Sequence, residues 1–595
     1  MQIILGIHDG HHSNACLFIN GKLICAIAEE RITRNKSEYG YPKNAINYCL
    51  HAAKIKKENI NIVALSTIHL PPKYALVKRA TTFSVNDYFR EQKEYWYPKF
   101  YKNENPAYLD IFKDKTKDIN SPYDYSFVKD EDDTKGMLKS RIELIKKELN
   151  INLDQIKVFD HHSCHAYYGY FWYHDHNRDF LVIAVDGAGD GANGSIWIAN
   201  KEKPLVNLVK TDQCNIGRIY RYTTLILGMK PNEHEFKVMG LAPYAKELYA
   251  NDSYEIFSST LSLSGLNFYY KKKIKDHFWY YKNKFDSHRF DNIAFGLQKF
   301  TEELLVSWVK SAIEETKINN IVLSGGVALN VKANKCISEI KLLNDLFVPP
   351  GPNDESLSVG ASFQYIVEEN NKRKNFNIIK HINPYLGIEY KTEDILALLK
   401  NEINIIIRPV DYQNIANLLK LEKIVARFSG KMEFGPRALG NRSILADPRE
   451  KKIISVINNM VKMRDFWMPF CPSIISECVN DYIINFKENK GSFMTMGYES
   501  TTLARKVIPA ALHPSDHTAR PQVVNSEYNK GLYKIISKFK DVTNVGCLLN
   551  TSFNIHGEPI VESPKDAINT FKKTGLNHLV FNDSILLSKY EVDID

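Results

Sequence analysis

The chain has 595 residues, of which 44% are hydrophobic and 25% are charged, and its formal net charge at pH 7 is +9. These values are ordinary for a soluble globular protein and exclude a disordered or fibrous chain. The sequence begins MQIILGIHDG, with no basic signal segment, and its longest apolar runs are too short to cross a bilayer. Nine scattered cysteines without a CxxC pair exclude a disulfide framework, so we expect a cytoplasmic protein with no membrane partner.

Three segments share a plan in which a short strand leads into a glycine-containing turn. Residues 4–30 predict a strand, a turn and two further strands that meet at Asn20-Gly21, a hairpin signal. Residues 180–199 repeat a strand, an Asp/Gly-rich turn and a strand, and residues 319–334 predict a strand, a Gly-Gly turn and a helix. This repetition predicts α/β lobes around a nucleotide cleft.

A polar stretch at residues 368–375, EENNKRKN, marks the expected end of the first domain. A solvated helix end explains this stretch equally well. We expect a first domain over residues 1–368, a linker region over 369–404, and a second α/β domain over 405–595.

Two histidines and two aspartates are candidates for a metal site. His161 and His165 lie four residues apart, so on a helix both imidazoles face the same side. Asp186 follows a buried-type strand, and Asp354 lies at a turn before a small-residue helix. Such a set favours iron, manganese or zinc over calcium. Packed histidines, a turn-opening Asp186 and a helix-capping Asp354 are the alternative.

The second half of the chain carries an anion-binding pattern. Residues 426–450 interleave three glycines with five cations, Arg427, Lys431, Arg437, Arg442 and Arg449. Guanidinium groups match phosphate and carboxylate oxygens, and glycines let the backbone fold closely around such a ligand. Pairing with nearby acids is the alternative, but it leaves the glycines unexplained. Lys462 and Arg464 alternate, which on a strand would point both to one side, and Arg520 follows in a loop.

Six motifs in this order resemble the O-carbamoyltransferase family typified by the nodulation, cephem-antibiotic and tobramycin carbamoyltransferases: DHHSCHA, VDGAGD, EFKVMGLAPYA, SGGVALN, GPRALGNRS and LNTSFNIHGEPIV. The resemblance implies a duplicated α/β N-terminal domain of the ATPase-like type found in actin, Hsp70 and sugar kinases. This domain would be similar to the tRNA threonylcarbamoyl-transfer enzyme. The C-terminal domain would be a YrdC-like α/β domain.

The same resemblance implies a two-step reaction. The C-terminal domain would form carbamoyladenylate from carbamoyl phosphate and ATP, the latter accompanied by Mg(II), with release of pyrophosphate and phosphate. The N-terminal domain would transfer the carbamoyl group to a hydroxyl of a small-molecule acceptor, with AMP as the leaving group. A divalent metal, expected to be Fe(II), would help to hold the adenylate there.

The family motifs carry residue roles onto this chain. His161, His165, Asp186 and Asp354 match the metal positions, and His12 in GHHSNA matches the general base for the acceptor hydroxyl. The resemblance assigns the nucleotide to Ser324, Gly325, Gly326 and Asn330. It assigns carbamoyl phosphate and ATP to Lys431, Arg437, Arg442, Lys462, Arg464 and Arg520, with catalytic roles for Arg437 and Arg442.

Two positions depart from the family pattern. The family usually has arginine at the position of Lys431 and before the Pro-Phe pair, where this chain has Met468. Lysine keeps the charge but loses the planar fork, and methionine loses both. We therefore expect weaker anion binding, or compensation by Arg464.

Residues 70–140 and 268–285 are rich in aromatic residues and lysine and resemble insertions. They suit a pocket for a sugar-like or secondary-metabolite acceptor, and a protein core or a homodimer contact explains them equally well. An RNA-directed threonylcarbamoyl-type transferase is the alternative function, because it has both domain types. Interspersed acids such as Glu91, Glu94 and Asp110 and the small charge excess argue against nucleic acid. A non-enzymatic anion-binding scaffold leaves His12 and the metal set without a role.

Overall fold

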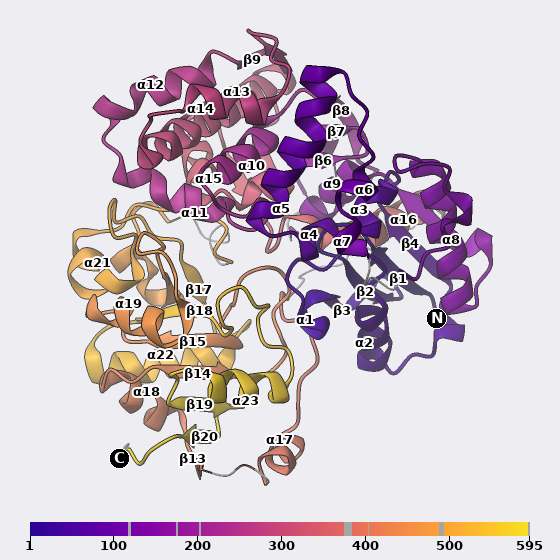
Figure 1. The fold of residues 1–595 in the computed structure, drawn as a ribbon. Helices are drawn as coiled ribbons and strands as arrows, with labels where there is room; N and C mark the ends of the chain where they lie inside the picture. The colour runs from indigo at the N-terminus through magenta and orange to yellow at the C-terminus, as the bar shows by residue number, and fades with distance from the viewer. Residues whose placement is uncertain are drawn as a thin grey trace. The chain divides into compact units, whose positions relative to one another are not determined.

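The computed structural model describes residues 1–116, 121–173, 177–200, 204–373, 383–400, 402, 404–486 and 493–592 (Figure 1). The chain forms two compact units, Met1–Ile382 and Asn383–Asp595. The expected linker, residues 369–404, lies partly outside the described residues, and its described part contains α17 (Thr392–Leu399).

The first sheet of the N-terminal unit has the strand order β3-β2-β1-β4-β5. Its members are β1 (Ile3–His8), β2 (Asn14–Ile19), β3 (Lys22–Ala28), β4 (Ile62–Ser66) and β5 (Ile156–Phe159). The first three form an antiparallel meander, whereas β4 pairs parallel to β1 and β5 parallel to β4. The predicted hairpin is confirmed, since Asn20 and Gly21 both have positive φ between β2 and β3.

The second sheet repeats this topology with the order β12-β11-β6-β7-β8. Its members are β6 (Phe180–Gly189), β7 (Ala192–Ala199), β8 (Val206–Thr211), β11 (Asn320–Ser324) and β12 (Asp345–Phe347). Again three strands form an antiparallel meander and two join in parallel. The duplicated α/β fold expected for the N-terminal unit is therefore confirmed.

Two helices bring the sheets together around the candidate site. α16 (Leu357–Arg373) packs against β1 and β4 of the first sheet and also against α9 (His161–Trp172). α9 in turn packs against β6 and β11 of the second sheet. All twelve residues of α9 are buried, so its position is fixed from every side.

Short helices fill the segment between β4 and β5, among them α3 (Pro72–Leu76), α5 (Val85–Arg90) and α6 (Tyr108–Ile111). Five of its aromatic residues, Phe83, Tyr88, Tyr95, Tyr108 and Phe112, are buried together with Phe278 from α13 (His277–Lys284). These rings form a core, which is one of the roles that the sequence left open. α8 (Thr134–Leu149) closes the segment.

Between β8 and β12 the chain forms several helices, which include α10 (Ile216–Ile226), α12 (Glu247–Ser258), α14 (Phe290–Thr316) and α15 (Val331–Ser338). α12 and α15 both pack against α14. Among the helices of the described residues, including the 27-residue α14, none is both long and apolar enough to span a membrane.

The C-terminal unit is built on an eight-stranded mixed sheet with the order β13-β20-β19-β14-β15-β18-β16-β17. The strands are β13 (Ile406–Pro409), β14 (Val425–Phe428), β15 (Arg442–Ala446), β16 (Cys471–Ile475), β17 (Gln522–Val524), β18 (Cys547–Ser552), β19 (His578–Phe581) and β20 (Ile585–Ser588). Its helices include α18 (Tyr412–Lys420), which packs against α22 (Lys530–Thr543), and α23 (Pro564–Lys573), which packs against β14.

Candidate metal centre and anion site

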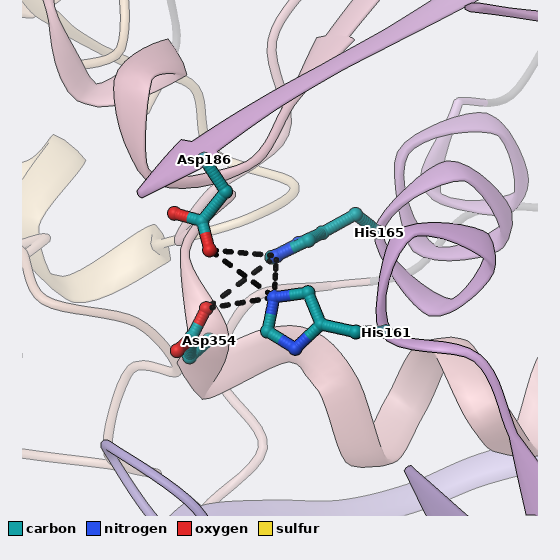
Figure 2. A group of neighbouring side chains, drawn as sticks. All are labelled: His161, His165, Asp186 and Asp354. Atoms are coloured by element: carbon teal, nitrogen blue, oxygen red, sulfur yellow. Dashed lines mark hydrogen bonds and ion pairs between the residues drawn. The ribbon is translucent and has the colours of Figure 1, made fainter. Parts of the chain in front are cut away.

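Two histidines and two aspartates from three separate segments converge in the N-terminal unit (Figure 2). His161 and His165 project from α9, Asp186 from the end of β6, and Asp354 from the short helix Asp354–Ser356 before α16. One potential ligand atom from each residue lies within 4.8 Å of all the others. The structure therefore brings together the four residues that the sequence singled out.

The spacing of these atoms fits one transition metal. The Nε2 atom of His161 lies 3.1 Å from Asp186 Oδ2 and 3.7 Å from Asp354 Oδ1. The Nε2 atom of His165 lies 3.4 Å from Asp354 Oδ1 and 3.9 Å from Asp186 Oδ2, and the two Nε2 atoms are 3.2 Å apart. Tetrahedral ligands at about 2.1 Å from a zinc-sized ion are separated by about 3.4 Å, which matches this arrangement.

The electrostatics of the cluster favour a positive charge at its centre. Burial opposes protonation of His161, but the hydrogen bond with Asp186 and the charge of Asp354 outweigh it and raise the pKa of His161 to about 9. Burial alone would raise the pKa of Asp186, yet its contacts with His161 and His165 hold that pKa well below the usual value. A bound metal cation would supply the same positive charge as these protons.

Local sequence explains how His161 reaches its place. Asp160 caps α9 by accepting a hydrogen bond from the Ser163 backbone N–H, so the helix begins at His161. The four-residue spacing then puts the His165 ring on the same side. Gly189 lies against the His161 ring, where an added Cβ would be only 2.2 Å from the ring carbons. The second glycine of VDGAGD, Gly189, is thus required for the approach of β6 to α9.

Two residues that were not among the predicted site residues form hydrogen bonds with His161. Thr67 Oγ1 lies 3.1 Å from His161 Nδ1, and a carboxylate oxygen of Asp190 accepts a hydrogen bond of 2.7 Å from the His161 backbone N–H. Asp190 is the second acid of VDGAGD, which is the one sequence signal available for it. Thr67 follows β4 and belongs to none of the recognised motifs.

His12 lies on a loop that is connected by hydrogen bonds to Asp354 of the candidate metal site. The Asn14 side-chain amide donates both to the His12 carbonyl oxygen, at 2.8 Å, and to the Asp354 carbonyl oxygen, at 2.9 Å. The rings of His11 and His12 are 3.9 Å apart, and the buried Nδ1 atom of each has no hydrogen-bond partner among the described residues. Burial, followed by the neighbouring His12, keeps the pKa of His11 well below the usual value.

The predicted nucleotide turn also contacts the metal cluster. Gly325 has φ +85° and donates its N–H to the Pro352 carbonyl oxygen at 2.9 Å. The Gly326 N–H donates to Asp186 Oδ1 at 3.2 Å, so Ser324 to Gly326 lie beside the cluster. The Asn330 side chain instead exchanges two hydrogen bonds of 3.0 Å with Gln298 and caps α15.

Three predicted cations of the C-terminal unit influence one another electrostatically: Lys462 is buried, and Arg464 and Arg520 are half-buried. Lys462 is 1% exposed, and its Nζ donates to Asn554 Oδ1 at 2.6 Å and to Ser552 Oγ at 3.0 Å. Arg520 donates to the Cys471 sulfur from Nη2 at 2.8 Å and from Nε at 3.2 Å. In the described part of this unit, no carboxylate forms an ion pair with Lys462, Arg464 or Arg520.

Burial and a neighbouring cation lower the pKa values of Lys462 and Arg464. Burial, and then the charge of Arg464, hold the pKa of Lys462 well below that of an ordinary lysine. Burial lowers the pKa of Arg464 to about 10, an effect that Cys471 opposes and Arg520 reinforces. Buried cations without a counter-charge favour the binding of an anion.

The expected strand arrangement of Lys462 and Arg464 is wrong. Lys462 ends a short helical segment, Asn458–Lys462, and the next residue, Met463, has φ +42°. The chain therefore turns between the two cations, and their proximity comes from the turn. Met468 is 6% exposed, so at this departure from the family pattern a side chain packs into the interior.

The glycine-rich segment folds as a tight loop around Arg442. Its Nη1 donates to the carbonyl oxygens of Ser429, Gly430 and Asn441 at 3.1–3.2 Å, and its guanidinium lies 3.6 Å from the centre of the Phe428 ring. The three predicted glycines all have positive φ, at Gly430, Gly435 and Gly440. Arg437 is half-buried in the same loop, and Lys431 is exposed.

Acids in and around this segment have structural roles. Glu433 Oε1 accepts the backbone N–H groups of Leu439, Asn441 and Arg442 at 2.6–3.2 Å, which fixes the loop. Arg427 pairs with Asp583 at 2.6 Å, and Arg449 pairs with Asp447 at 2.6 Å. Pairing with acids therefore accounts for these two arginines.

Comparison with known proteins identifies the family to which this chain belongs. The family model "Carbamoyltransferase N-terminus" matches residues 3–363, and "Carbamoyltransferase C-terminus" matches residues 416–589. The chain therefore belongs to the carbamoyltransferase family and is a carbamoyltransferase enzyme.

Relatives extend over nearly the whole chain. The uncharacterized protein MJ1051 of Methanocaldococcus jannaschii is 33% identical over 99% of both chains. The nodulation protein NolNO of Sinorhizobium fredii is 28% identical over 98% of this chain and 79% of its own length. Nodulation protein U of Rhizobium tropici is 27% identical over 45% of this chain and 44% of its own. Within the family, the chain is thus similar to the nodulation type.

Proposed function

We propose that this carbamoyltransferase forms carbamoyladenylate from carbamoyl phosphate and ATP in its C-terminal unit and transfers the carbamoyl group to a hydroxyl in its N-terminal unit. One observation carries the proposal: the same chain has a His/Asp cluster that favours a cation and a Lys/Arg cluster that favours an anion. Water would first hydrolyse carbamoyl phosphate to carbamate and phosphate, and a carbamate oxygen would then displace pyrophosphate from the α-phosphorus of ATP. Phosphate and pyrophosphate are thus the expected first products, and AMP is the last.

In the C-terminal unit, Lys462, Arg464 and Arg520 bind the phosphate groups. Lys462 is held by Asn554 and Ser552, and Arg520 by the Cys471 sulfur, so both cations are fixed before the substrates arrive. Such fixed charges stabilise the charge that develops on a leaving pyrophosphate without costly reorganisation. Arg437 and Arg442 act from the neighbouring loop, with Mg(II) brought in by ATP.

In the N-terminal unit, His161, His165, Asp186 and Asp354 would hold the metal, which we propose to be Fe(II). When bound, it would neutralise the adenylate phosphate. Ser324 to Gly326 bind the nucleotide at the edge of the cluster. His12 removes the proton of the acceptor hydroxyl, a role that suits an imidazole. The Asn14 side chain links the backbone of His12 to that of Asp354 by two hydrogen bonds.

The acceptor is a hydroxyl-bearing molecule, sugar-like or a secondary metabolite. Polar groups facing the insertion support this. Arg218 on α10 donates to the Gly187 carbonyl oxygen at 3.1 Å, next to Asp186. Arg221, three residues further on α10, has a buried Nε without a hydrogen-bond partner in the described residues. Sugar hydroxyls would satisfy such donors.

The first step is tested without any acceptor. Purified protein is incubated with carbamoyl phosphate and ATP, and pyrophosphate is measured. We expect release that depends on carbamoyl phosphate and that Arg437→Ala abolishes. Arg449→Ala is the matched control, because Arg449 is already paired with Asp447. Pyrophosphate release that required threonine and bicarbonate would overturn the proposal.

A further inference from the structure

Thr67 has an unusual backbone conformation at the back of the metal cluster. It is 6% exposed and has φ +67°, in the left-handed region. Residues branched at Cβ are rare there, because the side chain crowds the backbone. Such strain persists only where surrounding contacts impose it, and it concentrates at functional sites.

We infer that Thr67 is a positioning residue that aims His161 at the metal, and that Arg141 and Asp190 hold it in this strained conformation. The inference rests on the proposed metal site. The Thr67 hydroxyl lies 3.1 Å from His161 Nδ1. With Nδ1–H donating to that hydroxyl, the lone pair of the ring is on Nε2, the atom that faces Asp186 and Asp354.

Arg141 holds the backbone of Ser66 and Thr67 by hydrogen bonds to their carbonyl oxygens. Fully buried on α8, it donates from Nη1 to the Thr67 carbonyl oxygen at 2.9 Å and from Nη2 to the Ser66 carbonyl oxygen at 3.1 Å. Asp9 in turn fixes the guanidinium with contacts of 2.6 Å at Nη2 and 2.9 Å at Nε. Rotation of the Thr67 peptide would break these buried, charge-assisted bonds.

Asp190 forms hydrogen bonds with the backbone that follows Thr67 and also with the backbone of His161. Its carboxylate accepts the N–H of Ile68 at 2.9 Å and that of His69 at 2.6 Å. The same carboxylate accepts the His161 N–H at 2.7 Å. One carboxylate therefore binds both the backbone after Thr67 and the backbone of His161. This shared partner fixes the distance between the Thr67 hydroxyl and the His161 ring.

The identity of the residue points to the hydroxyl as its purpose. Glycine or asparagine would adopt φ +67° with less strain. What threonine adds is the oxygen near His161. The second histidine provides a contrast, because the buried Nδ1 of His165 has no hydrogen-bond partner in the described residues. Of the two histidines, only His161 therefore has a hydrogen-bond partner at Nδ1 among the described residues, and that partner is Thr67.

Four variants separate the hydroxyl from the backbone strain. Thr67→Val keeps the shape and the strain but removes the hydroxyl, Thr67→Gly removes both, and Thr67→Ser keeps the hydroxyl. Thr316→Val is the matched control, since the Thr316 hydroxyl donates to the Ala312 carbonyl oxygen within α14. Co²⁺ is titrated alone into each protein, with affinity from calorimetry and ligand geometry from the visible spectrum.

We expect Thr67→Val and Thr67→Gly to lower Co²⁺ affinity by about 10- to 100-fold and to change the spectrum. Thr67→Ser and Thr316→Val should match the wild type. The thermal unfolding midpoint of the metal-free Gly variant should not fall below that of the Val variant, because glycine relieves the strain.

Three results would overturn the inference: Val and wild-type proteins with equal Co²⁺ affinity, a Ser variant as weak as Val, or a wild type that binds no Co²⁺. Pyrophosphate release from carbamoyl phosphate and ATP is measured on the same samples. That step belongs to the C-terminal unit, so its absence from the wild type would count against the proposed function and leave the role of Thr67 standing.

Discussion

The metal cluster of the N-terminal unit and the cation cluster of the C-terminal unit differ in the sign of their charge. Around His161, two carboxylates raise the pKa of a buried histidine to about 9. Around Lys462, burial and a second cation lower the pKa of a buried lysine. These opposite shifts are the basis on which we propose a cation as the ligand of the first site and an anion as the ligand of the second.

The largest expected effect separates the two sites completely. Replacing His161 by alanine removes a direct ligand, so Co²⁺ affinity should fall by more than the roughly 100-fold caused by changes behind the ligands. Carbamoyl transfer should be lost, whereas acceptor-independent pyrophosphate release should stay at the wild-type rate. His51→Ala, on the exposed side of α2 (Lys43–Ala53), is the control. Loss of pyrophosphate release in His161→Ala would contradict the division of labour between the units.

A smaller effect is expected from Gly189→Ala. The added Cβ would lie 2.2 Å from the His161 ring, so the ring must shift from its place in the cluster. We expect Co²⁺ affinity to fall by about 10- to 100-fold, with pyrophosphate release unchanged. Gly187→Ala is the matched control, because a Cβ there meets no atom within 4 Å. Equal affinities of the two alanine variants would show that the ring can shift without cost.

The smallest effect concerns pH and the C-terminal unit. The folded-state pKa of Lys462 is lowered, so the unfolded chain binds the extra proton between that pKa and about 10.4. The free energy of unfolding should therefore rise with pH in this window, by at most about 1.4 kcal/mol per pH unit. Bound phosphate should keep Lys462 protonated and flatten the rise.

Denaturant unfolding with and without inorganic phosphate measures this dependence. Lys462→Met should remove both the pH dependence in this window and its response to phosphate. A phosphate response that survives in Lys462→Met would place the anion elsewhere.

Local signals in the sequence were sufficient to predict the strands, the Asn20-Gly21 hairpin and the shared helix face of His161 and His165. The sequence alone indicated Asp186 and Asp354 as candidate partners of these histidines, and the family resemblance assigned all four residues to one metal site. The contact between Thr67 and His161 spans 94 residues, and Lys462 meets Ser552 at a separation of 90. Hydrophobic periodicity encodes local structure, and it carries no record of which distant polar atoms will meet.

Aromatic composition was the least specific signal. On composition, the rings between β4 and β5 suited an acceptor pocket and a core equally well, and burial places five of them in one core. Conversely, Glu433 has an ordinary sequence context, yet it accepts three backbone N–H groups of the arginine loop. Its role depends on the loop conformation, which the sequence does not display.

The duplicated sheets place an aspartate at the same point in each half. Asp9 directly follows β1, and Asp186 follows the regularly paired part of β6, the corresponding strand. In one half the carboxylate is paired with the buried guanidinium of Arg141, and in the other it belongs to a group of four side chains that could hold a metal ion. The first repeat thus supplies its own counter-charge, and under the proposed function the second would take its counter-charge from a bound cation.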